Sequence, residues 1–367
     1  SHGQYDISGT QVYGWYDLPE PKSAYLIDGF YSLEKLKSDC TEVADAEIYY
    51  PGVGGIQLFF NSEFGGAAYG GPGWLNRDGV GKNYPFSWIP PWAQHHTIAH
   101  EAGHGIGLHH SSGPYGQTYD SRWDVMSKAS GSYDGAFGGI GIHTISYHKD
   151  WLGWIPSHAK YVLAQDGRAN LRLVHLAAAA GPGEYSMAEI AIANGEFYTV
   201  EARRDYGYDG PPEKAIVIHH VDPDRGRPAQ VVDPDNDGNP NDDGAAWVPG
   251  ETFEDRTNNV RVTVLSETNN GFEVEIERGS AGTDPDPLIA LSPTSLSYET
   301  TEGTDPSAKS FTVKNDGGGT LEYTVSSNRN WLSLSRSSGS LASGASQSVS
   351  VSVDASGLAV GTQSGTI

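Results

Sequence analysis

The stretch HTIAHEAGHGIGLHH, residues 96–110, constrains this chain more than any other, because it holds five of the 13 histidines. On a helix, His100 and His104 are four residues apart and share one face, so both imidazoles can bind a single zinc ion. Glu101 points toward the open coordination position, where a carboxylate can accept a proton from a water molecule on the metal. The stretch therefore predicts a zinc site, and a histidine-rich solvated helix is the alternative.

A third ligand is expected from the segment that follows the helix. Gly107 comes three residues after His104, and glycine readily adopts the left-handed conformation that ends a helix. A turn there brings His110 back as a third nitrogen ligand. Three histidines and one water form the open arrangement of a catalytic zinc site, whereas a structural site has a fourth protein ligand. Pro90 and Pro91 suit the start of this helix, since proline is tolerated in the first turn.

The remaining histidines near these positions, and a second pair further along, fit no ligand pattern. His95, His96 and His109 have the wrong offsets, and we expect them at the surface or behind the ligands. His219 and His220 lie in a predicted strand without an acidic or cysteine partner at ligand spacing, so we expect no second metal there.

HEAGHGIGLHH matches H-E-x-x-H-x-x-G-x-x-H, the zinc signature of the metzincin metallopeptidases, and WDVMS at 123–127 resembles the Met-turn that follows it. The resemblance implies that Met126 lies beneath the three histidines as a hydrophobic floor. Some metzincins carry a zinc-binding tyrosine two residues after the methionine. Lys128 occupies that position here, so a tyrosine of this kind is either absent or supplied elsewhere, with Tyr133 and Tyr147 as candidates.

Two further segments carry the resemblance. YHKDWLGWIP at 147–156 resembles the end of the catalytic domain in secreted metzincins such as immune inhibitor A and gametolysin. FYTVEARRDYGYDG at 197–210 is similar to the same proteins more loosely. The family implies a mixed α/β (α+β) catalytic domain, with strands and a helix before the zinc helix and irregular chain after it.

Residues 1–157 show the pattern expected for that domain. SAYLIDGFY at 23–31 is typical of a strand, an amphipathic helix is expected around 33–45, and residues 47–74 predict one or two strands with glycine breaks. Cys40 is the only cysteine, which excludes a disulfide within the chain, and we expect a buried thiol on the helix.

Composition and charge restrict the partners. Glycine (47) and tyrosine (20) are abundant and charged residues make up only 19%, which is typical of a loop-rich, β-rich extracellular protein. The formal net charge of -23 argues against nucleic acid and anionic membranes as partners and suits calcium binding. No apolar run reaches membrane-spanning length. Together with the absence of a disulfide framework, these features predict a secreted protein of bacterial origin.

Residues 158–278 predict an all-β domain, packed on the protease or forming its own sandwich. Short β-branched or alternating runs lie between turn signals. The runs are KYVLAQ, ANLRLVHLA, MAEIAIA, EFYTVEARR, KAIVIHHV, VRVTVLSET and GFEVEIER.

An acidic loop, DPDNDGNPNDDG at 233–244, lies within this region. Its alternating carboxylates are Asp233, Asp235 and Asp237. Followed by a glycine, they match the opening of a calcium-binding loop, in which hard oxygen ligands converge. The glutamate usual at the twelfth position is replaced by Gly244, so Asp242 or Asp243 would substitute. A solvated acidic loop is an equally good interpretation.

The C-terminal part is expected to fold separately. GSAGTDPDP at 279–287 has the composition of a linker. Residues 288–367 resemble the BACON family of immunoglobulin-like β-sandwiches, through SPTSLSY, FTVKNDG and NWLSLSRSSGSL. The resemblance implies carbohydrate contact or a spacer role, with Trp331 in the core rather than on a sugar-binding surface. The final SGTI is typical of the start of a last strand, so we expect the native domain to continue.

These features together predict a secreted zinc-dependent metalloendopeptidase with a protein or peptide substrate, glycoproteins included. Zinc would be bound by His100, His104 and His110, and Glu101 would act as the general base. The alternative is a non-catalytic or weakly catalytic protein on a metzincin scaffold that binds glycans or cell surfaces. A zinc hydrolase acting on a non-peptide bond also fits the motif. Glu101 favours an enzyme, because a pure binder has no need of it.

Substrate binding is expected at GGAAYGG, residues 65–71. A peptidase holds its substrate extended, and the free edge of a sheet can pair with an added strand. Ala67, Ala68 and Tyr69 are the predicted contacts, since small residues let a peptide backbone approach closely. A flexible glycine-rich turn is the alternative.

Overall fold

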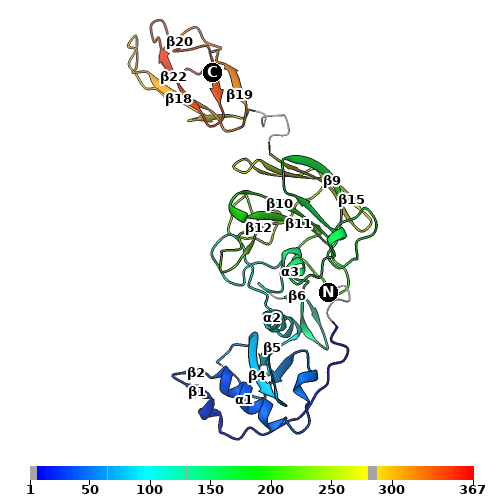
Figure 1. The fold of residues 1–367 in the computed structure, drawn as a ribbon. Coiled ribbons are helices and arrows are strands. Elements are labelled where there is room, and N and C mark those ends of the chain that lie inside the picture. The colour runs from blue at the N-terminus through cyan, green and yellow to red at the C-terminus, as the bar shows by residue number, and fades with distance from the viewer. Residues whose placement is uncertain (1–5, 64, 129, 280–286) are drawn as a thin grey trace. The chain divides into compact units, whose positions relative to one another are not determined.

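The computed structural model describes residues 6–63, 65–128, 130–279 and 287–367. The chain is mostly β and divides into two compact units, Ser1–Gly279 and Ser280–Ile367. Figure 1 shows the elements of each unit. The predicted linker at 279–287 lies almost wholly outside the described residues.

A three-stranded sheet with the order β3-β5-β4 forms the N-terminal part of the first unit. β3 (Ile56–Phe59) runs parallel to β5 (Val80–Ile89). β4 (Tyr69–Arg77) pairs antiparallel with β5 and is an edge strand. Asp78 and Gly79 link β4 to β5, both with positive φ, which is the conformation favoured in two-residue hairpins.

Two helices cover opposite faces of this sheet. Neighbouring side chains of a strand point to alternate faces. A Cβ placed at Gly70 of β4 would lie 2.0 Å from the backbone of α2 (His95–Gly105), whereas one at Gly73 would lie 3.2 Å from a side chain of α1 (Leu33–Val43). β4 and α2 are therefore in backbone contact, which only glycine permits.

The expected single strand over 23–31 is wrong. The chain instead forms the 3-10 helix η1 (Lys22–Tyr25) and a hairpin of β1 (Leu26–Ile27) and β2 (Phe30–Tyr31). The intervening residues 28–29 are Asp-Gly, both with positive φ, and this dipeptide favours a tight turn over a continuous strand.

The helix expected around 33–45 is confirmed as α1. Ser32 caps its N-terminus, where the hydroxyl oxygen accepts the Lys35 N–H at 3.2 Å. Cys40 lies on α1 but is half-buried rather than fully buried, and burial raises the pKa of its thiol to about 12. A second 3-10 helix, η2 (Tyr50–Gly52), leads into β3.

Irregular chain follows α2, as expected, up to a small hairpin of β6 (Ser130–Asp134) and β7 (Gly138–Gly141). α3 (Ser146–Trp151) comes next and begins one residue before the YHKDWLGWIP segment at 147–156. The 3-10 helix η3 (Ser157–Ala159) follows directly after that segment.

Two sheets then form a β-sandwich. The first has the order β13-β12-β11-β10-β8, and the second has the order β14-β15-β16-β9. The strands are β8 (Lys160–Leu163), β9 (Gly167–Val174), β10 (Met187–Ala191), β11 (Phe197–Arg203), β12 (Ala215–Val221), β13 (Ala229–Val231), β14 (Thr252–Asp255), β15 (Val260–Thr268) and β16 (Gly271–Arg278). The 3-10 helix η4 (Ala193–Gly195) connects β10 to β11.

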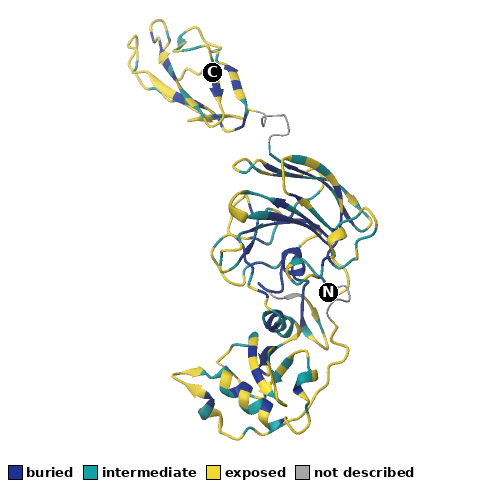
Figure 2. Cartoon of the chain, viewed as in Figure 1, coloured by how far each residue is buried: buried dark blue, intermediate teal, exposed yellow. Residues whose placement is uncertain are grey.

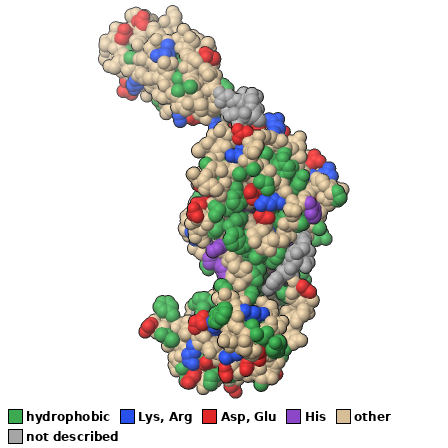
Figure 3. All heavy atoms as spheres, viewed as in Figure 1, with side chains coloured by type: hydrophobic (Ala, Val, Ile, Leu, Met, Phe, Trp, Pro, Cys, Tyr) green, Lys and Arg blue, Asp and Glu red, His purple; other side chains and the backbone are tan. Residues whose placement is uncertain are grey.

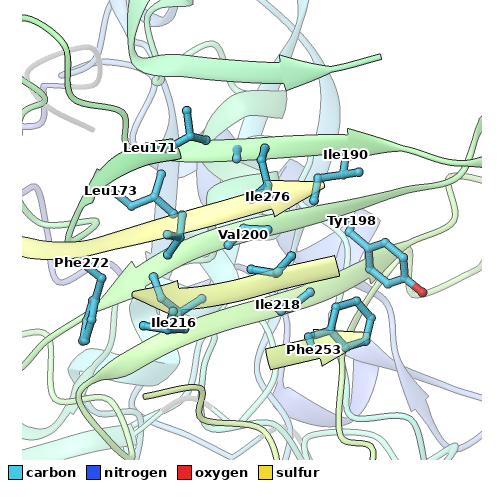
Figure 4. Packing of buried hydrophobic residues seen from close by; sticks show 14 of the residues in the cluster. Leu171, Leu173, Ile190, Tyr198, Val200, Ile216, Ile218, Phe253, Phe272 and Ile276 are labelled. Atoms are coloured by element: carbon cyan, nitrogen blue, oxygen red, sulfur yellow. The ribbon is translucent and has the colours of Figure 1, made fainter. Parts of the chain in front are cut away.

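The core of the sandwich lies between these two sheets. Leu173, Val200, Ile218 and Ile276 are fully buried there and come from both sheets. Figure 4 shows these side chains meeting between the strands, and Figure 2 shows how buried the strands are. β15 alternates between buried and less buried residues, as expected for a half-buried strand. β11 and β12 are instead buried on both faces.

All seven strands expected in this region are present, as β8 to β12, β15 and β16. β13 and β14 were not expected. β13 has only three residues, and β14 contains a single apolar residue, Phe253, so neither shows a recognisable strand pattern in the sequence.

The second unit contains two further sheets, with the orders β17-β18-β22-β20 and β19-β21. Its strands are β17 (Ile289–Ser292), β18 (Lys309–Asn315), β19 (Thr320–Thr324), β20 (Leu332–Leu334), β21 (Ser338–Ala342) and β22 (Ser346–Val353). Val313, Val349 and Val351 lie in its core. Trp331 is only half-buried, which corrects the expectation of a core residue: it lies just before the short β20 rather than within a strand.

On the face of the molecule that Figure 3 shows, acidic and basic side chains intermingle over the part that carries α1. Among the described residues, no helix is long and apolar enough to cross a membrane.

Candidate metal centre

The predicted zinc-binding helix is α2, but it begins later than expected. Gln94 is its N-cap, so Pro90 and Pro91 lie outside the first turn. The Pro90 carbonyl accepts the Ala93 N–H at 3.1 Å and forms a separate turn. Ile89 ends β5, and the chain has to leave the sheet through this turn before the helix can start.

The three predicted histidines converge through their Nε2 atoms. His100 and His104 are 3.1 Å apart, and the Nε2 atom of His110 lies 3.1 and 3.0 Å from them. The Nδ1 atom of His100 lies 2.7 Å from the carbonyl of Val125, and that of His104 lies 2.8 Å from the carbonyl of Leu108. A carbonyl only accepts, so both Nδ1 atoms carry the proton and both Nε2 atoms present a lone pair.

Gly107 brings His110 back toward the helix. Its φ is +97°, in the left-handed region that favours glycine. The Leu108 N–H donates to the carbonyl of Gly103 at 2.9 Å, and the Gly107 N–H donates to the carbonyl of His104 at 3.0 Å. This is a helix end in which the last carbonyls are satisfied by the reversing chain.

The donor set fits zinc. Burial lowers the pKa of His100, of His104 and of His110, the last to about 4, so these imidazoles are neutral near pH 7 and can act as ligands. Facing lone pairs repel unless a cation lies between them. Two nitrogen ligands in a tetrahedral zinc site are roughly 3.3 Å apart, within a few tenths of an ångström of the spacing here.

Glu101, the predicted general base, is buried on α2. It is 8% exposed, and burial raises the pKa of its carboxyl to about 7. It follows the first ligand along α2 and is not one of the three side chains whose nitrogen atoms converge. Its backbone carbonyl is the atom that Gly70 of β4 approaches most closely.

Met126 lies against α2 and is fully buried. A Cβ added to Gly103 would lie 2.4 Å from the Met126 sulfur, so the glycine provides the space that the methionine fills. Leu108 and Val125 belong to the same buried cluster. The role as a floor beneath the ligands stays a prediction of the metzincin resemblance.

Asp124 holds the turn around Met126. Its carboxylate accepts the Ser111 hydroxyl at 2.6 Å and the Met126 N–H at 3.1 Å, and lies 3.0 Å from the Nδ1 atom of His148. Burial by itself would raise the pKa of Asp124, but His148 and these hydrogen bonds hold it well below its usual range. Asp124 thereby fixes the turn whose Val125 carbonyl accepts a hydrogen bond from His100.

The tyrosine nearest the histidines is Tyr119, which sequence reasoning missed. Its ring centroid lies 5.0 Å from that of His110 and 5.8 Å from that of His100. Burial, followed by the charge of Glu101, raises the pKa of its phenol. Its φ of +61° is unusual for a residue with a side chain. No motif offset marks a tyrosine at this place, so only the fold brings it here.

The two tyrosines named in the sequence analysis as candidates for a zinc-binding tyrosine have other surroundings. Tyr133 is 75% exposed on β6. Tyr147 is buried in α3, where its ring packs against His148 and Phe197. Lys128, at the position where some metzincins have tyrosine, is exposed.

The FYTVEARRDYGYDG segment anchors the centre from the sandwich side. Arg203 is fully buried, and it forms ion pairs with Glu201 at 3.1 Å and Asp209 at 2.9 Å. Its guanidinium also donates to the carbonyl of Trp123 at 2.7 Å and that of His143 at 3.3 Å. β11 therefore binds the start of the Met126 turn directly, a contact that the sequence did not reveal.

The other histidines have roles that need no metal. His96 contacts the carbonyl of Gly139 at 2.9 Å, and His109 is exposed. His95 accepts the Gly141 N–H at 3.2 Å. Within the described part of the chain, neither His219 nor His220 belongs to a group able to hold a metal.

The acidic loop brings together part of the predicted calcium set. One oxygen atom from each of Asp233, Asp235 and Asp242 lies within 4.8 Å of the others. Asp237 is exposed and accepts the Asn239 N–H at 2.7 Å, and it is not part of that group. Calcium binding stays a prediction.

The predicted substrate strand lies beside the centre. Ala67 and Ala68 are half-buried and directly precede β4, and Tyr69 is its first residue. The sheet order leaves one side of β4 unpaired among the described strands. Pairing of a peptide with this edge stays a prediction.

Comparison with known proteins identifies only the second unit. Residues 288–367 match the family model described as "Viral BACON domain". The C-terminal unit is a BACON-like domain. Searches of curated proteins and of solved structures found no match for this chain. The BACON resemblance is confirmed, and the metzincin resemblance and the carbohydrate contact remain predictions.

Proposed function

We propose that this chain is a secreted zinc-dependent metalloendopeptidase of the metzincin type. The observation that carries the proposal is the convergence of the Nε2 atoms of His100, His104 and His110, with Glu101 buried beside the first of them. Three neutral imidazoles leave a fourth position open, which is typical of catalytic rather than structural zinc.

The hydrogen bonds around the ligands support this assignment. Metal-binding histidines generally donate their second ring N–H to an oxygen atom, which fixes the tautomer. His100 and His104 each have a backbone carbonyl in that position, from Val125 and Leu108. A solvated histidine-rich helix would have no reason to hold its rings in this way.

When bound, zinc supplies a Lewis acid and lowers the pKa of a water molecule in the open position. Glu101 accepts a proton from the attacking water and delivers it to the leaving amine, which a carboxyl with a raised pKa can do near neutral pH. The phenol of Tyr119, beside His110, donates a hydrogen bond to the oxygen atom that gains charge.

The edge strand β4 supports a peptide as the substrate. β4 pairs only with β5 among the described strands, and Gly70 places its backbone against that of Glu101. An extended peptide added to this edge would lie next to the catalytic carboxylate. A non-catalytic binder would need neither this proximity nor the buried Glu101.

The test is metal analysis combined with Glu101→Gln. We expect one zinc per chain in both proteins and hydrolysis of a peptide library by the wild type alone, with turnover falling at least roughly 100-fold in the variant. Glu20→Gln, at an exposed site, is the control and should keep full activity. Substantial turnover by Glu101→Gln, or a wild-type chain without zinc, would refute the proposal.

A further inference from the structure

The acidic loop between β13 and β14 has a carboxylate with an unexplained environment. Asp233 is only 5% exposed, and its Oδ1 atom has no hydrogen-bond partner among the described residues. Its Oδ2 atom accepts the Tyr115 hydroxyl at 2.6 Å, so the side chain is firmly oriented. A buried oxygen without a donor is costly unless an ordered water or a cation satisfies it.

Other oxygen atoms face the same place. A Cβ added to Gly244 would lie 2.6 Å from Asp233 Oδ1 and 2.5 Å from Asp235 Oδ2. Asp242 contributes the third carboxylate, within 4.8 Å of the other two. Only glycine at position 244 leaves the space between these oxygens open.

We propose that Asp233, Asp235 and Asp242 bind one Ca²⁺ ion, and that this ion stabilises the segment that carries Tyr119. Calcium takes oxygen ligands at about 2.4 Å in irregular geometry, so two of its ligands can be at most about 4.8 Å apart. Magnesium requires a near-ideal octahedron and retains its waters, which an irregular loop accommodates less well.

The coupling to Tyr119 follows from contacts between the acidic loop and residues 113–123. Besides Tyr115, which binds Asp233, the indole N–H of Trp123 donates to the carbonyl of Pro240 at 2.9 Å. Asn241 accepts the backbone N–H of Arg122 at 2.5 Å.

The side-chain amide of Asn241 also makes a second hydrogen bond to this segment. The Nδ2 atom of Asn241 donates to the carbonyl of Asp120 at 2.7 Å. The loop thus holds the segment near both ends, at Tyr115 and at residues 120–123. Tyr119 lies between these points, over His110 and His100.

The binding test is calorimetric titration of CaCl₂ into the zinc-loaded full chain in calcium-free buffer. We expect one site per chain. Losing a residue that only hydrogen-bonds a metal ligand weakens metal binding by roughly 10- to 100-fold. Asp235→Asn and Asp242→Asn each change a ligand itself, so each should weaken calcium binding by more than that. Both residues are accessible and the substitutions keep side-chain size, so folding should survive. Asp237→Asn is the matched control from the same loop and should bind normally.

Several results would overturn the site. These are an absence of calcium binding at millimolar concentration, wild-type affinity in Asp242→Asn, or loss of binding in Asp237→Asn. Magnesium binding as tightly as calcium would overturn the choice of ion.

The coupling is tested by amide hydrogen exchange with and without calcium. We expect calcium to slow exchange within residues 113–123 in the wild type and to leave it unchanged in Asp242→Asn. Calcium binding without slower exchange there would overturn the coupling. Neither measurement depends on peptide hydrolysis, so both remain informative if the proposed function fails. Only an effect of calcium on peptide turnover would depend on the proposed function.

Discussion

At the scale of single residues, the centre depends on side chains whose partners lie far away in sequence. His100 owes its tautomer to Val125, and Met126 fills the space left by Gly103. Tyr119 lies beside the histidines and comes from irregular chain rather than from a motif. Under the proposed function, its phenol would stabilise negative charge on a substrate oxygen.

Tyr119→Phe tests this role. If the proposed function holds, removing one donor to the developing oxyanion should lower kcat by roughly 100-fold while KM and zinc content change little. Steady-state kinetics on a peptide substrate, with metal analysis, measures both. Tyr133→Phe, at an exposed residue of β6, is the control and should behave as wild type. An unchanged kcat in Tyr119→Phe would exclude the phenol from catalysis.

At the scale of elements, the centre is held between β4 and the sandwich. α2 packs on β4 through Gly70, and β11 reaches the Met126 turn through Arg203. The buried ion pairs of Arg203 are costly to form. Removing the arginine alone would be worse, because the buried carboxylates of Glu201 and Asp209 would lose their counter-ion.

Arg203→Met should therefore reduce the free energy of unfolding by about 3–5 kcal/mol, measured by urea denaturation. The neighbouring Arg204→Ala is the control. Arg204 pairs with Glu267 at a partly exposed site, so its loss should cost no more than about 1 kcal/mol. Equal costs for the two variants would mean that the buried network does not anchor β11 to the turn.

At the scale of the whole molecule, the two units have separate cores and separate sheets. The candidate centre and the contacts that position it lie within Ser1–Gly279. The BACON-like domain contributes no residue to the groups that could hold a metal in the described part of the chain.

A protein ending at Gly279 should thus keep its zinc and hydrolyse short peptides as the full chain does. One ending at residue 157 should not fold, because it lacks Arg203 and the strands that anchor the Met126 turn. Peptide turnover, zinc content and thermal unfolding of the two truncations measure this. Complete loss of activity in the longer protein would show that the C-terminal unit takes part in hydrolysis.

The sequence by itself determined the features that depend on local spacing. Four-residue spacing on a helix and a glycine able to adopt positive φ were enough to predict that His100, His104 and His110 converge. β-branched or alternating runs between turn signals predicted the longer strands of the sandwich, because both patterns are typical of strands packed in a sheet. These patterns are missing from β13, which has three residues, and from β14, which contains one apolar residue.

Only the tertiary structure decided which distant residues meet. Tyr119 lies beside the histidines in a segment, residues 113–123, that the acidic loop holds. Asp242 rather than Asp237 joins Asp233 and Asp235, because the turn at residues 242–246 packs Gly244 against those two carboxylates. Arg203 reaches Trp123 across 80 residues of chain. Such contacts are made by packing between elements, and no spacing along the chain encodes them.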